Sequence, residues 1–216
     1  MNFILGSIFS FTILIAGIIA LIRFRQIHKT YYLFLYFVWL ACLNELLSYF
    51  LATTKHSTFL NNNIYVLFES LLIILFLKKR LSAMKYNIIF HILIVSIIGA
   101  WGYENLILGK IFTVSSYFRV YYSFVLVLLS ITTINKLLST VRTNIFANSV
   151  FLICIGFILY FTIKILVEIF WLYGIYNQNF QSLVYNIIIY INLFTNLIYA
   201  LAILWMPKKQ IFTMPS

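Results

Sequence analysis

Long apolar runs, broken by short polar segments, divide the chain along its whole length. Seven stretches are long and apolar enough to form helices that cross a bilayer: residues 3–22, 31–52, 58–77, 86–103, 111–134, 148–172 and 181–206. The connections between them hold about 5 to 13 residues, which leaves no room for a soluble domain. The pattern therefore predicts an all-α polytopic membrane protein, with residues 1–216 forming a single seven-transmembrane-helix bundle.

The composition agrees with a chain that lies mostly in lipid. Hydrophobic residues make up 64% of the chain and charged residues only 9%, whereas a soluble domain carries about 25% charged residues. Cys42 and Cys154 both fall within predicted helices, so the sequence indicates neither a disulfide framework nor a thiolate metal site.

Basic residues gather in every second connection. Eleven of the 15 lysines and arginines fall on one side of the predicted bundle: Arg23, Arg25, Lys29, Lys78, Lys79, Arg80, Lys85, Lys136, Arg142, Lys208 and Lys209. Loops on the cytoplasmic side carry such an excess. We therefore expect the N-terminus outside and the C-terminus in the cytoplasm, in a multi-pass protein of the plasma (inner) membrane. Because the net charge of +11 comes from these loops, which face the lipid bilayer, nucleic-acid binding is not predicted.

Five ionisable side chains fall inside predicted helices, where charge is costly. They are Glu45, Glu69, Arg119, Lys164 and Glu168, from four different helices. A charge in hydrocarbon costs roughly 2.5–3.5 kcal/mol on insertion scales, so such residues face the bundle interior and pair with one another. All five fall between the middle of the bilayer and its outer surface. We expect them to converge on one outward-facing pocket, with Lys164 and Glu168 pairing as neighbours on one helix.

Further polar positions refine this expectation. Asn192 and Asn196 follow one stripe of the last helix and are added to the predicted ligand-binding or ion-pair network. Glu104 is expected in an outer loop, and Asn61–Asn63 are expected to cap the outer start of the third helix. Two interpretations of the network are open: it locks helix to helix, or it lines a pocket whose formal charge of −1 a cation, a proton or a cationic ligand group completes.

Enzyme signatures are mostly absent. His28, His56 and His91 fall at unrelated places, so a three-histidine zinc centre is not predicted, and no Gly-x-Ser-x-Gly turn occurs. The chain contains no aspartate, which excludes aspartyl proteolysis. No catalytic residue, metal or cofactor is assigned, although a glutamate-based acid–base site built from Glu45, Glu69 and Glu168 stays open.

A weak internal repeat accompanies the seven helices. "LNELLSYF" resembles "LVEIFWLY" and aligns Glu45 with Glu168, and "IYVLFESLLIILFLKK" resembles "IYINLFTNLIYALAILWMPKK". Helices 1–3 and 5–7 would then be parallel repeats joined by helix 4, a 3+1+3 design known from transporters.

The chain as a whole resembles the broad heptahelical class of PQ-loop sugar transporters, microbial rhodopsins and receptor-like sensors, and is similar to seven-helix input modules of bacterial sensors. It lacks the Pro-Gln pair of the transporters and a lysine in its last helix for retinal.

Three functions follow as hypotheses. The first is a receptor-like or sensory membrane protein that binds a small polar or amphiphilic ligand from outside and acts on a cytoplasmic signalling partner. The second is a small-solute transporter, with proton coupling through a glutamate. The third is a membrane-embedded lipid-modifying enzyme.

Overall fold

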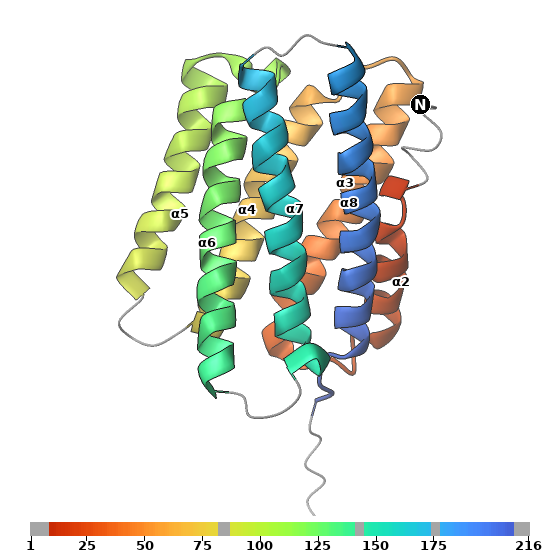
Figure 1. Cartoon of the computed structure of the whole chain (residues 1–216), viewed down its shortest axis with the longest axis vertical. Coiled ribbons are helices and arrows are strands. Elements are labelled where there is room, and N and C mark those ends of the chain that lie inside the picture. The colour runs from red at the N-terminus through yellow and green to blue at the C-terminus, as the bar shows by residue number, and fades with distance from the viewer. Residues whose placement is uncertain (1–8, 82–86, 141–144, 174–177, 210–216) are drawn as a thin grey trace, which may run out of the picture.

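The computed structural model describes residues 9–81, 87–140, 145–173 and 178–209, without the side chains of residues 178–183 and 185. Within these ranges the chain is helical, apart from turns and one isolated bridge between Ile27 and Lys208. Its α-helices are α2 (Ile13–Arg23), α3 (Tyr32–Thr53), α4 (Phe59–Leu81), α5 (Asn87–Gly102), α6 (Ser116–Thr140), α7 (Ser149–Leu172) and α8 (Gln178–Leu204). They stand side by side and run alternately up and down in Figure 1.

The helical bundle predicted from the apolar runs is confirmed. Each helix falls on one of the seven stretches, and six of them, α3 to α8, contain spans long and apolar enough to cross a membrane. The helix α2 is shorter, with 11 residues. The chain thus has the features of a multi-pass membrane protein.

Six helices form a closed ring, and the seventh lies outside it. In order around the ring, α2, α3, α4, α6, α7 and α8 each pack on the next, and α8 packs back on α2. The helix α5 packs on α4 and α6 from outside the ring, at the edge of the view in Figure 1. Two consecutive triplets, α2–α4 and α6–α8, therefore meet at two interfaces. This order is compatible with the 3+1+3 design, which stays a prediction.

Large apolar side chains cover the outer surface of the bundle. Ile22, Leu43 and Ile88 are 73%, 64% and 72% exposed. Monomeric soluble proteins rarely expose extensive apolar patches, because water solvates them poorly. Buried polar side chains, by contrast, gather between the helices. This distribution is the one that a hydrocarbon environment favours.

The connection between α5 and α6 differs from the sequence expectation. The helix α5 continues into a π-helical turn, Tyr103–Ile107, and a 3₁₀ turn, Lys110–Phe112, precedes α6. Glu104 therefore does not lie in an outer loop: it is 2% exposed, and its carboxylate accepts hydrogen bonds from the backbone N–H groups of Tyr117 and Phe118. It caps the first turn of α6, whose N–H groups lack partners within the helix.

An aromatic layer fills the middle of the ring. The ring of Tyr199 on α8 makes edge contacts with Phe34, Phe37 and Phe157, at centroid distances of 5.4, 5.9 and 5.7 Å. All four side chains are buried. Gly156 on α7 makes room for the Tyr199 ring, because a Cβ at this position would lie 2.5 Å from its Cε1 atom. The layer fills the interior of the ring in the half where α3 and α7 begin and where α8 ends.

Replacing Gly156 with alanine is expected to lower the free energy of unfolding by about 1–3 kcal/mol, since the added methyl group overpacks a filled core. Unfolding in mixed detergent micelles, followed by circular dichroism, measures this change. Gly99→Ala is the control, because nothing lies within 4 Å of the Cβ that it adds. Equal stability of the two variants would contradict the close approach of α7 and α8.

At the end of the ring opposite to Glu104, hydrogen bonds to backbone carbonyls join α2 and the α2–α3 connection to the end of α8. The guanidinium of Arg23 donates to the carbonyl oxygens of Ile203 and Met206, at 2.5 and 3.3 Å. These carbonyls come at the end of α8, where helices leave acceptors without partners. The N–H of Lys209 donates to the carbonyl of Gln26 at 2.7 Å. The α2–α3 connection and the segment after α8 therefore form one unit.

Candidate functional site

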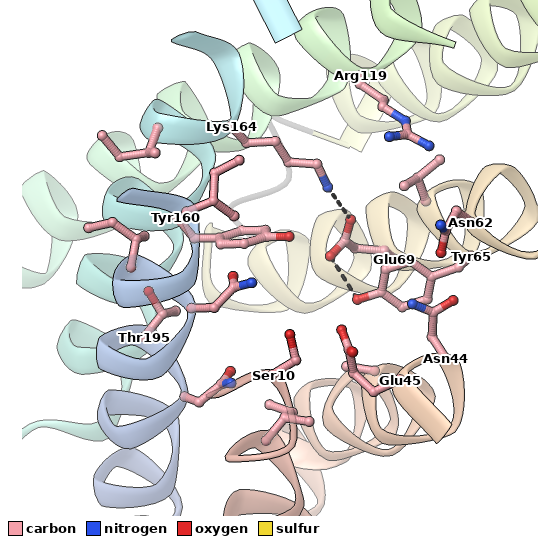
Figure 2. A pocket seen from close by; sticks show the side chains of 18 of the residues that line it. Ser10, Asn44, Glu45, Asn62, Tyr65, Glu69, Arg119, Tyr160, Lys164 and Thr195 are labelled. Atoms are coloured by element: carbon pink, nitrogen blue, oxygen red, sulfur yellow. Dashed lines mark hydrogen bonds and ion pairs between the residues drawn. The ribbon is translucent and has the colours of Figure 1, made fainter. Parts of the chain in front are cut away.

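A cavity of about 270 Å³ lies inside the ring. It occupies the half where α3 and α7 end and where α4, α6 and α8 begin, as the positions of its lining residues show. Figure 2 shows polar side chains from several helices pointing into it. The seven residues of the predicted network all line this cavity: Glu45, Glu69, Arg119, Lys164, Glu168, Asn192 and Asn196.

The first ion pair joins α7 to α4. Lys164 Nζ lies 3.3 Å from Glu69 Oε2, and the Glu69 side chain is 1% exposed. The hydroxyl groups of Tyr65 and Tyr122 donate to the two carboxylate oxygens of Glu69 at 2.9 and 2.7 Å. Both oxygens of this buried carboxylate therefore have donors, and one of them has a cation as well.

The second ion pair joins α6 to α7. Arg119 Nη1 lies 3.2 Å from Glu168 Oε1, and the hydroxyl of Ser116 donates to Glu168 Oε2 at 2.7 Å. Arg119 Nη2 donates to Asn63 Oδ1 at 3.1 Å. The guanidinium thus connects three helices, α4, α6 and α7, beside the cavity.

The expected pairing of Lys164 with Glu168 within one helix is wrong. Each of the two pairs with a residue of a facing helix instead, Lys164 with Glu69 and Glu168 with Arg119. A pair within α7 would leave one buried anion and one buried cation, Glu69 and Arg119, without counter-charges. The cross-helix arrangement neutralises all four, and an uncompensated buried charge costs several kcal/mol.

Asn61–Asn63 do not cap their helix, because α4 begins earlier, at Phe59. The fully buried Asn63 donates through Nδ2 to the carbonyls of Lys110, Ile111 and Thr113 at 3.2, 3.0 and 2.8 Å. Its Oδ1 accepts from Arg119 and from the hydroxyl of Ser115. Asn63 therefore anchors the segment before α6 and supports Arg119, a role that depends on residues remote in the sequence.

The helix α8 contributes amides and hydroxyls to the cavity. Asn196 Nδ2 donates to the hydroxyl of Thr12 at 3.0 Å, which joins α8 to the residue before α2. Thr195 and Tyr199 also line the cavity and are 2% and 3% exposed, yet their hydroxyl groups have no hydrogen-bond partner among the described residues. Buried polar groups are nearly always paired, so these two hydroxyls are exceptions in the cavity wall.

Glu45 on α3 completes the charged lining. Among the described residues it has no ion pair and no hydrogen bond, in contrast to Glu69 and Glu168. Sequence reasoning placed Glu45 in the network but did not separate it from the other two glutamates. It also missed Ser10, Asn44 and Thr195, which line the cavity and are short polar residues common in any helix.

We also searched the described residues for metal-ligand clusters and compared the chain with known proteins. No cluster of three or more histidine, cysteine or acidic residues that could hold a metal occurs in the described part of the chain. Comparison with protein-family models, with curated proteins and with solved structures finds no match.

Proposed function

We propose that this chain is a receptor-like membrane protein that binds a small polar or amphiphilic ligand inside its helix ring. The supporting observation is the cavity itself, whose wall holds ionisable residues from four helices together with unpartnered buried hydroxyls. A network that only locked helices together would be expected to satisfy its own polar groups. Concave sites with a few convergent polar groups on an apolar wall are typical of small-molecule binding.

The proposed orientation puts the cavity toward the outside. The helix ends and connections at the opposite end of the ring carry Arg23, Arg25, Lys29, Lys78 and Lys79. Segments rich in lysine and arginine stay in the cytoplasm. In this orientation a ligand enters from the outer leaflet side, and the basic end contacts a cytoplasmic partner.

A structural route for a signal runs along α8. Its middle part lines the cavity through Asn192, Thr195 and Tyr199, and its last carbonyls are held by Arg23. The Tyr199 ring belongs to the aromatic layer that closes the ring below the cavity. We propose that a ligand contacting Thr195 or Tyr199 shifts α8 and so repacks the basic end, because packed helices move between discrete arrangements.

The second candidate function is transport of a small solute. Its specific support is the order of the helices, since two consecutive triplets around a central cavity match the parallel repeats of some transporters. In that case the aromatic layer is the closed inner gate of an outward-open state.

Three probes of similar size and different charge test the binding proposal: cyclohexylammonium, cyclohexanol and cyclohexanecarboxylate. We expect at least one of them to bind the protein in lipid nanodiscs, measured by isothermal titration calorimetry against empty nanodiscs. Ala41→Phe should abolish this binding, because Ala41 lines the cavity and the added ring fills it. Val167→Phe serves if Ala41→Phe does not fold.

Binding of none of the three probes, or binding that both cavity-filling variants retain, would contradict the proposal. Proteoliposomes then separate the two candidate functions. Passage of the bound probe across the membrane, abolished by the same variant, supports the transporter, whereas binding without passage supports the receptor.

A further inference from the structure

The four glutamates of the chain are not equivalent. Three of them have a cationic partner within 3.4 Å: Glu69 has Lys164, Glu104 has Lys110 and Glu168 has Arg119. Glu45 is the exception among the described residues, although its side chain lies in the cavity wall with the other charges. In Figure 2 its carboxylate points into the cavity from the side opposite to Lys164.

The described residues offer no spare cation for Glu45 near the cavity. The two basic residues that line it, Arg119 and Lys164, already pair with Glu168 and Glu69. The segments outside the described ranges that adjoin Phe9 and the α7–α8 connection, residues 1–8 and 174–177, contain no lysine or arginine. The cavity lining therefore carries three formal negative charges against two positive ones.

The paired carboxylate of Glu168 indicates which groups the carboxylate of Glu45 lacks, namely a cation and a hydroxyl donor. The sequence repeat aligns these two residues, on α3 and α7. At Glu168 the guanidinium of Arg119 comes from the preceding helix of the triplet, α6, and a serine hydroxyl completes the set. The preceding helix at Glu45 is α2, and the chain just before it offers Ser10 to the cavity but no cation.

The remaining wall of the cavity favours a small organic molecule over a bare ion. Apolar side chains of Ile13, Phe37, Val66, Ile163 and Val167 line it. Its volume of about 270 Å³ is slightly below the range of about 300–1,000 Å³ of common ligand sites, so the occupant is small.

We propose that the ligand of this cavity is a small organic cation, whose ammonium or guanidinium group binds the Glu45 carboxylate while its apolar part packs against the aliphatic wall. This inference rests on the proposed function, because it names the class of ligand that the same cavity takes. The bound cation brings the formal charge of the lining to zero. Charge-assisted hydrogen bonds are roughly twice as strong as neutral ones, so the Glu45 contact decides which molecules bind.

The three probes named above also test this inference. Cyclohexylammonium is expected to bind the protein in nanodiscs more tightly than cyclohexanol or cyclohexanecarboxylate. Glu45→Gln should weaken its binding about 10- to 100-fold, the range expected for a lost hydrogen bond to a charged group. Because Glu45 has no ion pair among the described residues, this variant should keep the unfolding midpoint of the unmodified protein.

Glu104→Gln is the matched control, since it removes the same charge at the same end of the bundle but outside the cavity lining. It should leave cyclohexylammonium binding unchanged. If Glu104→Gln does not fold, Lys55→Gln serves as the control, because this exposed residue also changes the charge at this end by one unit.

The outcomes separate the two proposals. Equal affinity of cyclohexylammonium for the unmodified protein and for Glu45→Gln overturns the cation inference. Preferential binding of the alcohol or the carboxylate, blocked by Ala41→Phe, also overturns it and leaves the proposed function in place. Binding of none of the probes overturns both proposals.

Discussion

Arg119→Leu is expected to lower the free energy of unfolding by about 3–5 kcal/mol, the cost of breaking a buried ion pair by removing one partner. The Arg119 and Glu168 side chains are 15% and 7% exposed, so the Glu168 carboxyl would lose its counter-charge in a place with little access to water. The variant also removes a donor from Asn63, which holds the carbonyls before α6. Unfolding in mixed detergent micelles, followed by circular dichroism, measures the loss.

Two further variants show whether the loss comes from the stranded carboxylate. Adding Glu168→Gln to Arg119→Leu should recover part of the lost stability, because it removes the uncompensated charge. Arg25→Leu removes an exposed arginine from the α2–α3 connection and should change stability by about 0.5 kcal/mol or less. If the double variant is no more stable than Arg119→Leu alone, the ion pair with Glu168 is not what Arg119 contributes.

Lys164→Met is expected to destabilise the protein by about 3 kcal/mol, toward the lower end of the range for broken buried pairs. Methionine keeps an unbranched side chain but leaves Glu69, which is 1% exposed, without its cation. The loss stays near the lower end because the hydroxyls of Tyr65 and Tyr122 still donate to the carboxylate. The same unfolding experiment measures it.

The identity of the rescuing substitution distinguishes the cross-helix pair from a pair within α7. In the Lys164→Met background, Glu69→Gln should restore stability because it removes the stranded charge. Glu168→Gln should lower stability further, since it leaves Arg119 without its carboxylate as well. The reverse pattern, with rescue by Glu168→Gln, would contradict the cross-helix pair. It would support instead the pairing of Lys164 with Glu168 that their four-residue spacing predicts.

The two ion pairs, Lys164–Glu69 and Arg119–Glu168, lie in the wall of the cavity. They join α4 to α7 and α6 to α7, and so stabilise the half of the bundle where the cavity lies. The other half is filled by aromatic side chains and closed by Arg23 at the end of α8. The interior of the ring is thus polar and hollow in one half and packed with aromatic side chains in the other.

Much of this architecture could be predicted from the sequence. Helix positions followed from apolar runs, because the length of chain that crosses a bilayer is fixed by its thickness. The convergence of Glu45, Glu69, Arg119, Lys164 and Glu168 on one interior cavity followed from the cost of charge in hydrocarbon. Whether the cavity binds a ligand stays a prediction.

The errors share one physical origin. Glu104 and Asn63 were read from their neighbours in the chain, as a loop residue and a cap, but both bond to the segment before α6 or its first turn. Lys164 was paired with the closest opposite charge on its own helix, although its partner Glu69 lies 95 residues away in the sequence. Spacing along one helix contains no information on what the facing helix presents.

By itself the sequence determined which segments are helices, that their outer surfaces are apolar and which costly side chains turn inward, because each of these depends on hydropathy along a single helix. The tertiary structure alone decided which inward side chains meet, which carboxylate lacks a cation among the described residues, and where the polar cavity ends at the aromatic layer. Those outcomes depend on the order and rotation of helices around the ring, and such contacts join residues far apart in the chain.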